Sequence, residues 1–429
     1  MEPTFVSGNR ILRVSEMAEN LIPSEIIKLG GEIREKIAAG EQIYNFTIGD
    51  FNPAIFPIPE ELKSAIIEAY QNNETNYPAA NGQLELRQSV SRFLHTRGGL
   101  EYSEDQLLVA GGSRPLIYAV YRTLVDPEDK VIYPVPSWNN NHYCHLSGAK
   151  GIPITARAED NFMPTAASIA PHVSGATLIA LCSPLNPTGT AFSRTQLEAI
   201  CRLVLDENRK RKETDKPLYL LFDQVYWTLT HDDNLHFDPV SLFPEMKDYT
   251  LYIDGLSKAF AATGVRVGWA FGPRKVMDKM KAILGHVGAW APRAEQMAVA
   301  QFLQQDAALD RFLEDFTKKL HERLHGFYQG FTQLKSEGFA VDAIAPQGGI
   351  YLTVKFELIG KTTPDGKKLT TALDVTQFLL NTAHLAIVPF SAFGASRNNP
   401  WFRISVGTAK IEDIEQVLLN VKQALSQLQ

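Results

Sequence analysis

Six short apolar runs between residues 107 and 271 constrain the fold more than any other feature of the sequence. Segments with helical periodicity separate them. A strand that is apolar on both faces must be covered on both sides, which is typical of a mostly parallel sheet between two layers of helices. The sequence therefore predicts an α/β fold. The expected strands are residues 107–110, 131–133, 178–182, 218–222, 251–253 and 267–271.

The chain has 429 residues, enough for two or three domains. We expect an N-terminal arm with part of a small domain over residues 1–60 and a large domain over 61–310. A smaller α+β domain is expected over 311–429, where a few strands alternate with helices. The long helical pattern that begins after residue 295 is expected to break near Gly326 or Gly330.

Composition argues against several classes of partner. The net charge of −6 and the pI near 6.0 do not favour nucleic acid or an anionic membrane. No apolar run approaches the roughly 18 residues of a membrane helix, and the first residues lack a signal pattern, so a cytoplasmic location is expected. The three cysteines form no Cys-x-x-Cys pair. His142 and His145 have no further ligand at a recognisable spacing, so no metal is expected.

Residues 250–268 place one lysine and one arginine eight residues apart, after an expected strand. Three glycines in this stretch permit tight backbone paths, so Lys258 and Arg266 can converge from a loop. A partly desolvated lysine near a second cation loses its charge more easily and can form a Schiff base with a carbonyl compound. Taken alone, an exposed surface lysine remains the commoner interpretation.

A glycine-rich turn follows the first expected strand. Ser113 is the expected N-cap of the next helix, with Pro115 in its first turn. Free backbone N–H groups at a helix N-terminus bind phosphate, and Gly111 and Gly112 would let an anion approach closely. A plain glycine turn is the alternative.

Other polar and aromatic residues follow the later strands, where ligands collect in open sheets of this kind. Trp138 presents an aromatic face there, although core packing is the alternative. A carboxylate such as Asp223 at the end of an apolar strand needs a cationic partner, which a pyridinium nitrogen would supply. Asn186 and Tyr226 can donate to a phenolate-like oxygen, while a turn role also explains Asn186.

Together these residues resemble the class I and II aminotransferases, the pyridoxal-phosphate enzymes of fold type I that include aspartate and aromatic aminotransferases. The segment from Gly255 to Gly268 matches the lysine signature of that family at every defined position. The resemblance covers most of the chain. It implies a sheet of the seven-stranded type flanked by helices, and ping-pong transfer of an amino group between an L-amino acid and a 2-oxo acid.

The resemblance also implies residue roles. Lys258 would carry the cofactor as a Schiff base and move a proton, Asp223 would keep the ring nitrogen protonated, and Tyr226 would bind the ring oxygen; these three are the expected catalytic residues. The cofactor-binding residues implied are Gly112, Ser113, Arg114, Trp138, Asn186, Asp223, Tyr226, Ser257, Lys258, Arg266 and, from a neighbouring subunit, Tyr77. The substrate-binding residues implied are Gly49, Arg403, Trp138 and Asn186.

By the same resemblance, Arg403 would hold the substrate α-carboxylate as a bidentate fork. The role of Tyr77 implies a homodimer with shared active sites. Trp290 and Arg293 stand where the family often shapes the side-chain pocket, and the sequence leaves open which of them does so. A carbon–sulfur lyase or related synthase on the same fold is the alternative activity. A cofactor-sensing regulator is a third hypothesis, but no helix-turn-helix precedes the region.

Overall fold

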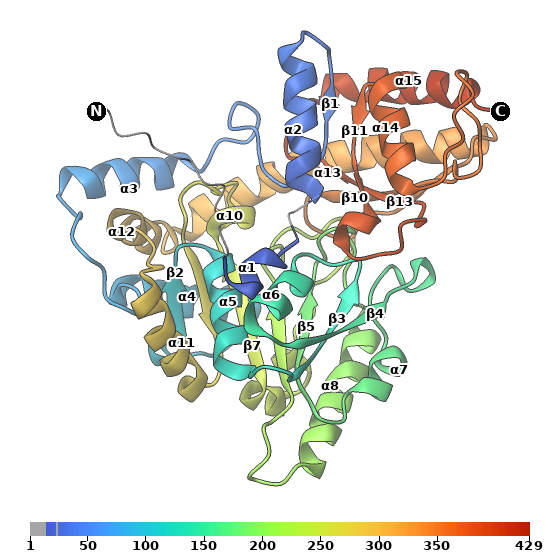
Figure 1. Cartoon of the computed structure of the whole chain (residues 1–429). Helices are drawn as coiled ribbons and strands as arrows, with labels where there is room; N and C mark the ends of the chain where they lie inside the picture. Colours follow the sequence, from blue (N-terminus) through green and yellow to red (C-terminus); the bar gives the residue numbers. More distant parts are fainter. Residues whose placement is uncertain (1–13, 23–24) are drawn as a thin grey trace, which may run out of the picture.

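The computed structural model describes residues 14–22 and 25–429, and its centre is a seven-stranded sheet (Figure 1). The strand order is β2-β8-β7-β6-β5-β3-β4, and only β8 runs antiparallel to its neighbours. The strands are β2 (Leu107–Ala110), β3 (Lys130–Val135), β4 (Lys150–Thr155), β5 (Ala176–Cys182), β6 (Tyr219–Asp223), β7 (Thr250–Gly255) and β8 (Gly268–Phe271).

The expected α/β fold is confirmed, and so are all six expected strands. The seventh strand, β4, was not expected from the sequence. It pairs only with β3 at the edge of the sheet and is partly exposed, and Pro153 interrupts its apolar character. An edge strand lacks the continuous apolar run that identifies a central strand.

Alternate residues of each central strand belong to two different cores. Leu178, Ala180 and Leu221 pack on the side of helices α5 and α11, whereas Ile179 and Leu220 pack on the side of α4, α8 and α12. The sheet is therefore covered on both faces, as its apolar strands require. The flanking helices are α4 (Leu84–Gly98), α5 (Ser113–Leu124), α8 (Arg194–Lys210), α11 (Arg274–Val287) and α12 (Arg293–Phe302).

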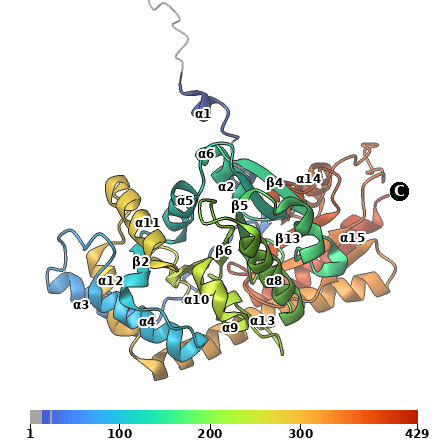
Figure 2. The same ribbon diagram turned by 90° about the horizontal axis from the view of Figure 1, so that it is seen from below.

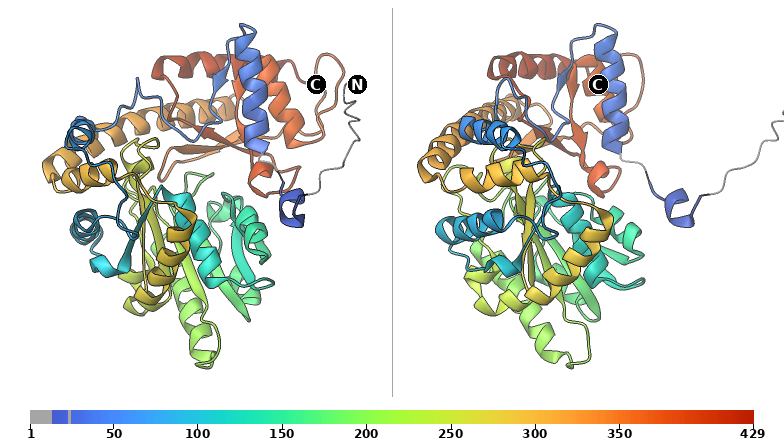
Figure 3. Two further views of the ribbon diagram at one scale, coloured as in Figure 1. Left: turned by 60° about the vertical axis from the view of Figure 1, so that its left-hand side comes forward. Right: turned by 90° about the vertical axis from the view of Figure 1, so that its left-hand side faces the viewer.

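A second, antiparallel sheet lies beyond the upper edge of the large sheet in Figure 1. Its strand order is β12-β13-β10-β9, and helices α13, α14 and α15 pack around it (Figure 3). The elements are β9 (Val341–Ile344), β10 (Tyr351–Phe356), β12 (Val388–Pro389), β13 (Trp401–Ser405), α13 (Asp306–Ser336), α14 (Ala372–Thr382) and α15 (Ile414–Ser426).

The N-terminal segment joins this second sheet region. β1 (Tyr44–Asn45) pairs in parallel with β11 (Leu385–Ala386), and α2 (Glu25–Ala38) packs Leu29 and Ile33 against Leu380. Residues 1–13 and 23–24 lie outside the described residues. The domain boundaries remain a prediction, and the one after residue 310 falls inside α13.

The expected break in α13 is wrong, because the helix runs without interruption from Asp306 to Ser336. Its two glycines serve close packing. A Cβ on Gly330 would overlap Leu418, and one on Gly326 would lie 3.3 Å from Ile414. Both contacts are side chains of the α15 segment, which therefore approaches α13 at its two glycines.

The remaining helices are short connections or surface elements, several of which are visible from below in Figure 2. None of the helices in the described part of the chain is long and apolar enough to cross a membrane. The helices are α1 (Glu16–Glu19), α3 (Glu60–Gln71), α6 (Asn140–Ser147), α7 (Ala166–Ile169), α9 (Pro239–Leu242) and α10 (Leu256–Ala259).

Candidate active site

Lys258 lies in the short helix α10 directly after β7, and not in the loop that the glycines suggested. Its Nζ donates a hydrogen bond to the backbone carbonyl of Gly49, which comes from the N-terminal segment. The ring of Phe51 lies 5.8 Å from Nζ. The large sheet and the N-terminal segment therefore enclose the amine together.

Burial lowers the pKa of Lys258 to about 8. The negative charge of Asp50 opposes this shift, and the positive charges of three arginines, Arg403, Arg114 and Arg266, add to it. A lysine with a lowered pKa carries a larger share of the neutral amine, the form that acts as a nucleophile and accepts protons.

Arg266 lies against the glycine-rich turn at the end of β2. Its Nη2 donates to the carbonyl of Gly111 at 2.9 Å, and its Nη1 donates to the carbonyl of Thr263 at 2.6 Å. A Cβ on Gly112 would overlap this guanidinium group, so only glycine leaves room for it. Arg266 and the Gly112 turn therefore lie together at the end of β2.

Ser113 is not the N-cap of α5, as the sequence suggested, but its first residue. Gly112 is the N-cap instead, with φ of 98°, a conformation that favours glycine. Ser113 and Ser257 make no side-chain hydrogen bond to any other described residue. The first backbone N–H groups of α5 thus open beside Arg266, which suits an anion.

Asp223 is the last residue of β6, at the same edge of the sheet as Lys258. Burial raises the pKa of its carboxyl to about 7, and the backbone N–H of Val225 partly opposes the shift by donating at 3.2 Å. Within residues 14–22 and 25–429, no cationic side chain forms an ion pair with it. A buried carboxylate without a counter-charge is costly, which identifies it as a candidate functional group.

Arg403, on β13 of the second sheet, is 2% exposed. Its Nη1 donates to Asn186 Oδ1 at 2.9 Å, and its Nη2 donates to the carbonyl of Thr47 at 2.6 Å. Its Nε has no partner among the described residues, and its guanidinium carbon lies 4.7 Å from the ring centroid of Tyr351. This buried cation has neutral partners only, so an incoming carboxylate would supply its missing counter-charge.

Tyr226 and Tyr351 form a pair that the sequence did not reveal. Their hydroxyl oxygens are 2.8 Å apart, and both side chains are buried. Tyr226 follows β6, whereas Tyr351 begins β10 in the second sheet, 125 residues later. In the sequence, Tyr351 resembled an ordinary core residue of an apolar strand.

Trp138 lies next to Arg114, whose guanidinium carbon is 5.3 Å from its ring centroid. The ring of Phe393, from the second sheet region, is 6.4 Å away. Arg114 is exposed and forms no ion pair with any described residue, although its charge reaches Lys258. Trp138 and Arg114 therefore border the site from one side.

Tyr77 and Arg293 are not brought to Lys258 within the described chain. Tyr77 is 83% exposed, and its ring lies 5.4 Å from that of Trp290. The Nε of Arg293 forms a 2.6 Å ion pair with Glu74. A Cβ on Gly111 would lie 3.4 Å from the carbonyl oxygen of Trp290, so Trp290 and Tyr77 adjoin the glycine-rich turn on its outer side.

Of the two histidines after Trp138, one makes a contact with the N-terminal segment. His145 contacts the carbonyl of Met17 through its Nε2 at 2.7 Å. Across the part of the chain that the structure describes, no group of three or more histidine, cysteine, aspartate or glutamate side chains is placed to bind a metal ion.

The fold and this arrangement define a member of the aminotransferases. The family model described as "Aminotransferase class I and II" matches residues 41–420. The chain therefore belongs to this family, and it is a transaminase with the aspartate aminotransferase fold.

Individual relatives agree with this assignment. An aspartate aminotransferase of Rhizobium meliloti (strain 1021) is 30% identical over 94% of both chains. An aspartate/prephenate aminotransferase of Cereibacter sphaeroides is 27% identical over 92% of this chain and 94% of its own. The solved structure of the aspartate aminotransferase from Rhizobium meliloti is 28% identical, with a TM-score of 0.88 over 97% of this chain and 100% of its own. These relatives do not favour the lyase alternative.

Proposed function

We propose that this chain moves an amino group between an L-amino acid and a 2-oxo acid with pyridoxal 5'-phosphate bound through Lys258. The family is known to use this cofactor. The observation that carries the proposal is the half-buried Lys258, whose pKa is lowered to about 8 by burial and by the positive charges of three arginines. A lysine in such surroundings is suited to covalent catalysis.

Three features of the site lack a binding partner in the protein and fit the cofactor and its substrate. The turn at Gly112, with Arg266 and the N-terminus of α5, fits a phosphate. The half-buried carboxyl of Asp223 lacks a cation, which a protonated ring nitrogen would supply. The unpartnered Nε of Arg403 fits the carboxylate of an amino acid.

We assign the other cofactor contacts to residues around this space. Asn186 and Tyr226 would bind the ring oxygen, and Trp138 would stack on the ring. The backbone N–H groups and hydroxyls at Ser113 and Ser257, with the charge of Arg114, would support the phosphate end. When bound, the cofactor supplies an electron sink for the bonds at the substrate Cα.

The protein residues then perform binding and proton transfer. Arg403 orients the substrate by its α-carboxylate, with the backbone of Gly49 on the other side. In the first half of the ping-pong cycle the Nζ of Lys258 would move a proton from the substrate Cα to the bound cofactor, and in the second half it would move a proton from the cofactor to the Cα of the second substrate. Its lowered pKa makes the neutral amine available near pH 8. Asp223 holds a proton at the ring nitrogen throughout.

We further propose a cytoplasmic homodimer in which Tyr77 reaches the phosphate of the neighbouring subunit. The high exposure of Tyr77 next to the glycine-rich turn supports this role. Aspartate is the first donor to test, because the relatives are named for it. The ion pair between Arg293 and Glu74 speaks against Arg293 as the side-chain recognition group, since its charge is already matched.

A half-reaction screen tests the proposal. The protein reconstituted with pyridoxal phosphate should be yellow, lose that colour with an amino donor, and regain it with a 2-oxo acid. Release of ammonia or a thiol would instead identify a lyase, and absence of colour would contradict both activities. The variant Lys258→Ala should lose this cycle of colour change. Lys275 is an exposed lysine on α11, and Lys275→Ala is the matched control, which should behave as the wild type.

A further inference from the structure

Tyr351 contacts three parts of the site, and nothing above gives it a role. Its hydroxyl oxygen is 2.8 Å from that of Tyr226, and its ring lies beneath the guanidinium group of Arg403 at 4.7 Å. A Cβ on Gly49 would lie 2.5 Å from the same hydroxyl. The Tyr351 hydroxyl is therefore enclosed between Tyr226 and the backbone of Gly49.

The hydrogen bond between the two hydroxyls uses the hydrogen of only one of them. A tyrosine hydroxyl can donate one hydrogen bond, and it can accept others. If Tyr226 donates to Tyr351, its only hydrogen is used and it cannot donate into the site. If Tyr351 donates to Tyr226, the hydrogen of Tyr226 remains free. The direction of this one bond decides whether Tyr226 can serve as a donor.

Charge favours Tyr351 as the donor. Burial raises the pKa of both hydroxyls. At Tyr351 the positive charge of Arg403 is the largest influence after burial and opposes the rise, whereas at Tyr226 it comes last among the influences on the pKa. The hydroxyl of Tyr351, whose ring lies beneath the cation, is therefore the more acidic of the two, and a more acidic hydroxyl is the better hydrogen-bond donor. The cation above its ring thus orients the bond from Tyr351 to Tyr226.

From this geometry we infer that Tyr351 is a positioning residue for transamination, which donates to Tyr226 and so frees the Tyr226 hydrogen to bind the ring oxygen of the cofactor. The inference rests on the proposed function, because the role of Tyr226 comes from it. Tyr351 acts through Tyr226 and not by contact with the cofactor.

The variant Tyr351→Phe tests this inference, because it removes the hydroxyl and keeps the ring beneath Arg403. Without its donor, Tyr226 stabilises negative charge on the ring oxygen less well. The pKa of the yellow chromophore, measured from absorbance spectra against pH, should rise by about half a unit to one unit, as expected for one lost hydrogen bond. An unchanged chromophore pKa in the folded, yellow variant would overturn the inference.

A double variant separates an action through Tyr226 from an independent one. Tyr226→Phe should raise the chromophore pKa more than Tyr351→Phe does. Adding Tyr351→Phe to it should change nothing further, because the intermediary is gone. Additive shifts would show that Tyr351 acts by another route and would overturn the inference.

Tyr252→Phe is the structural control. This tyrosine is also fully buried, and its hydroxyl donates to Asp238 at 2.8 Å on the other side of the sheet. The control should lower the melting temperature and leave the chromophore pKa unchanged. A shift as large as that of Tyr351→Phe would mean that any buried hydroxyl has the effect, which contradicts a specific role.

A substitution that should lower the chromophore pKa keeps the inference testable if Tyr351→Phe does not fold. 3-Fluorotyrosine at position 351 keeps the side chain and makes its hydroxyl a stronger donor, so the chromophore pKa should fall. A rise would contradict the direction of the hydrogen bond. A wild-type protein that takes up no chromophore would disprove the proposed function itself, whereas a yellow, active protein with no response at Tyr351 would disprove only this inference.

Discussion

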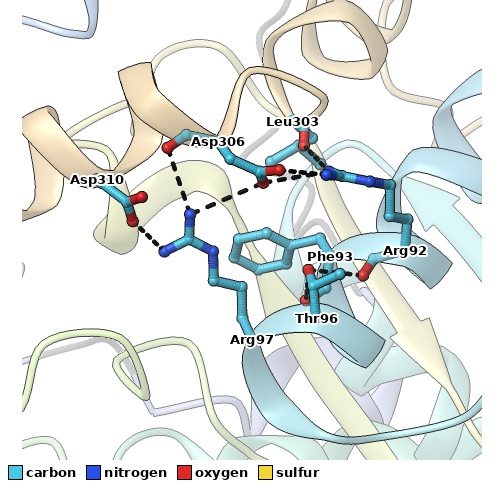
Figure 4. A network of polar contacts seen from close by, with 7 residues as sticks. All are labelled: Arg92, Phe93, Thr96, Arg97, Leu303, Asp306 and Asp310. Carbon is cyan, nitrogen blue, oxygen red and sulfur yellow. Dashed lines mark hydrogen bonds and ion pairs between the residues drawn. The ribbon is translucent and has the colours of Figure 1, made fainter.

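Two arginines on the surface of this protein and one in its candidate active site have opposite surroundings. Arg92 and Arg97 on α4 are paired with Asp306 and Asp310 at the start of α13, on the surface (Figure 4). The side chain of Arg92 is 41% exposed. Arg403 is buried in the site, has only neutral hydrogen-bond partners and leaves its Nε unpartnered among the described residues.

The difference separates stability from function. Exposed ion pairs contribute about 0.2 to 1 kcal/mol each, and salt screens them. Burying a charge without a counter-charge costs several kcal/mol. Arg87 and Arg323 are also buried without an ion pair, but among the described residues only Arg403 leaves a buried arginine nitrogen unpartnered. Arg403, and not the surface pairs, therefore indicates what the protein binds.

The largest expected effect is the loss of activity in Lys258→Ala. Removing the amine eliminates both covalent attachment and proton transfer, so kcat should fall by about 10⁴-fold or more. The variant should keep its circular dichroism spectrum and still bind the cofactor without a covalent bond. Normal turnover in this variant would contradict the assigned site.

Arg403→Met should show the next largest effect and tests the comparison directly. Loss of the carboxylate partner should lower kcat/KM at least about 30-fold, since a buried charge pair is worth 2 to 5 kcal/mol. The free energy of unfolding, measured in urea, should stay the same or rise, because an unmatched buried charge is removed. A large loss of stability would mean that Arg403 holds the fold together.

The pH dependence of stability tests the charge state of Lys258. Its folded pKa of about 8 lies below the ordinary lysine value of 10.5, so between these values the unfolded chain binds more protons than the folded chain. The cofactor-free protein should therefore gain stability as pH rises from 8 to 10.5, by a few kcal/mol at about 1.4 kcal/mol per pKa unit. The Lys258→Met variant should lack this gain in stability between pH 8 and 10.5. Identical pH profiles of stability for the variant and the wild type would contradict a lowered pKa at Lys258.

The smallest expected effect is that of Arg92→Met. Removing this exposed partner of Asp306 should lower the free energy of unfolding by less than about 1 kcal/mol and leave kcat/KM unchanged. The loss should shrink further in high salt. A loss of several kcal/mol would show that the surface pairs of Figure 4 matter more to the fold than the comparison allows.

Periodicity and motif residues sufficed for the central sheet and for much of the site. The buried runs such as 178–182 identified the strands, because strands covered on both faces are apolar throughout. Asp223 and the Gly112 turn could be placed together because parallel strands end at one edge. The edge strand β4 escaped detection because it lacks such a run.

Other features depend on contacts between distant parts of the chain. The pairing of Tyr226 with Tyr351 joins residues 125 positions apart, and no local pattern distinguishes such a tyrosine from a core residue. The glycines of α13 look like helix breakers until Leu418 is seen to pack against Gly330. Likewise, Gly112 takes the N-cap position from Ser113 through a backbone angle that the residue types alone do not reveal.

The central claim is that Lys258 carries the cofactor, and chemical trapping tests it most directly. The yellow protein would be reduced with borohydride, digested and analysed by mass spectrometry. The account predicts one reduced cofactor on the peptide containing Lys258, and none after prior conversion with an amino donor. A label on another lysine, or no label on a yellow protein, would contradict it.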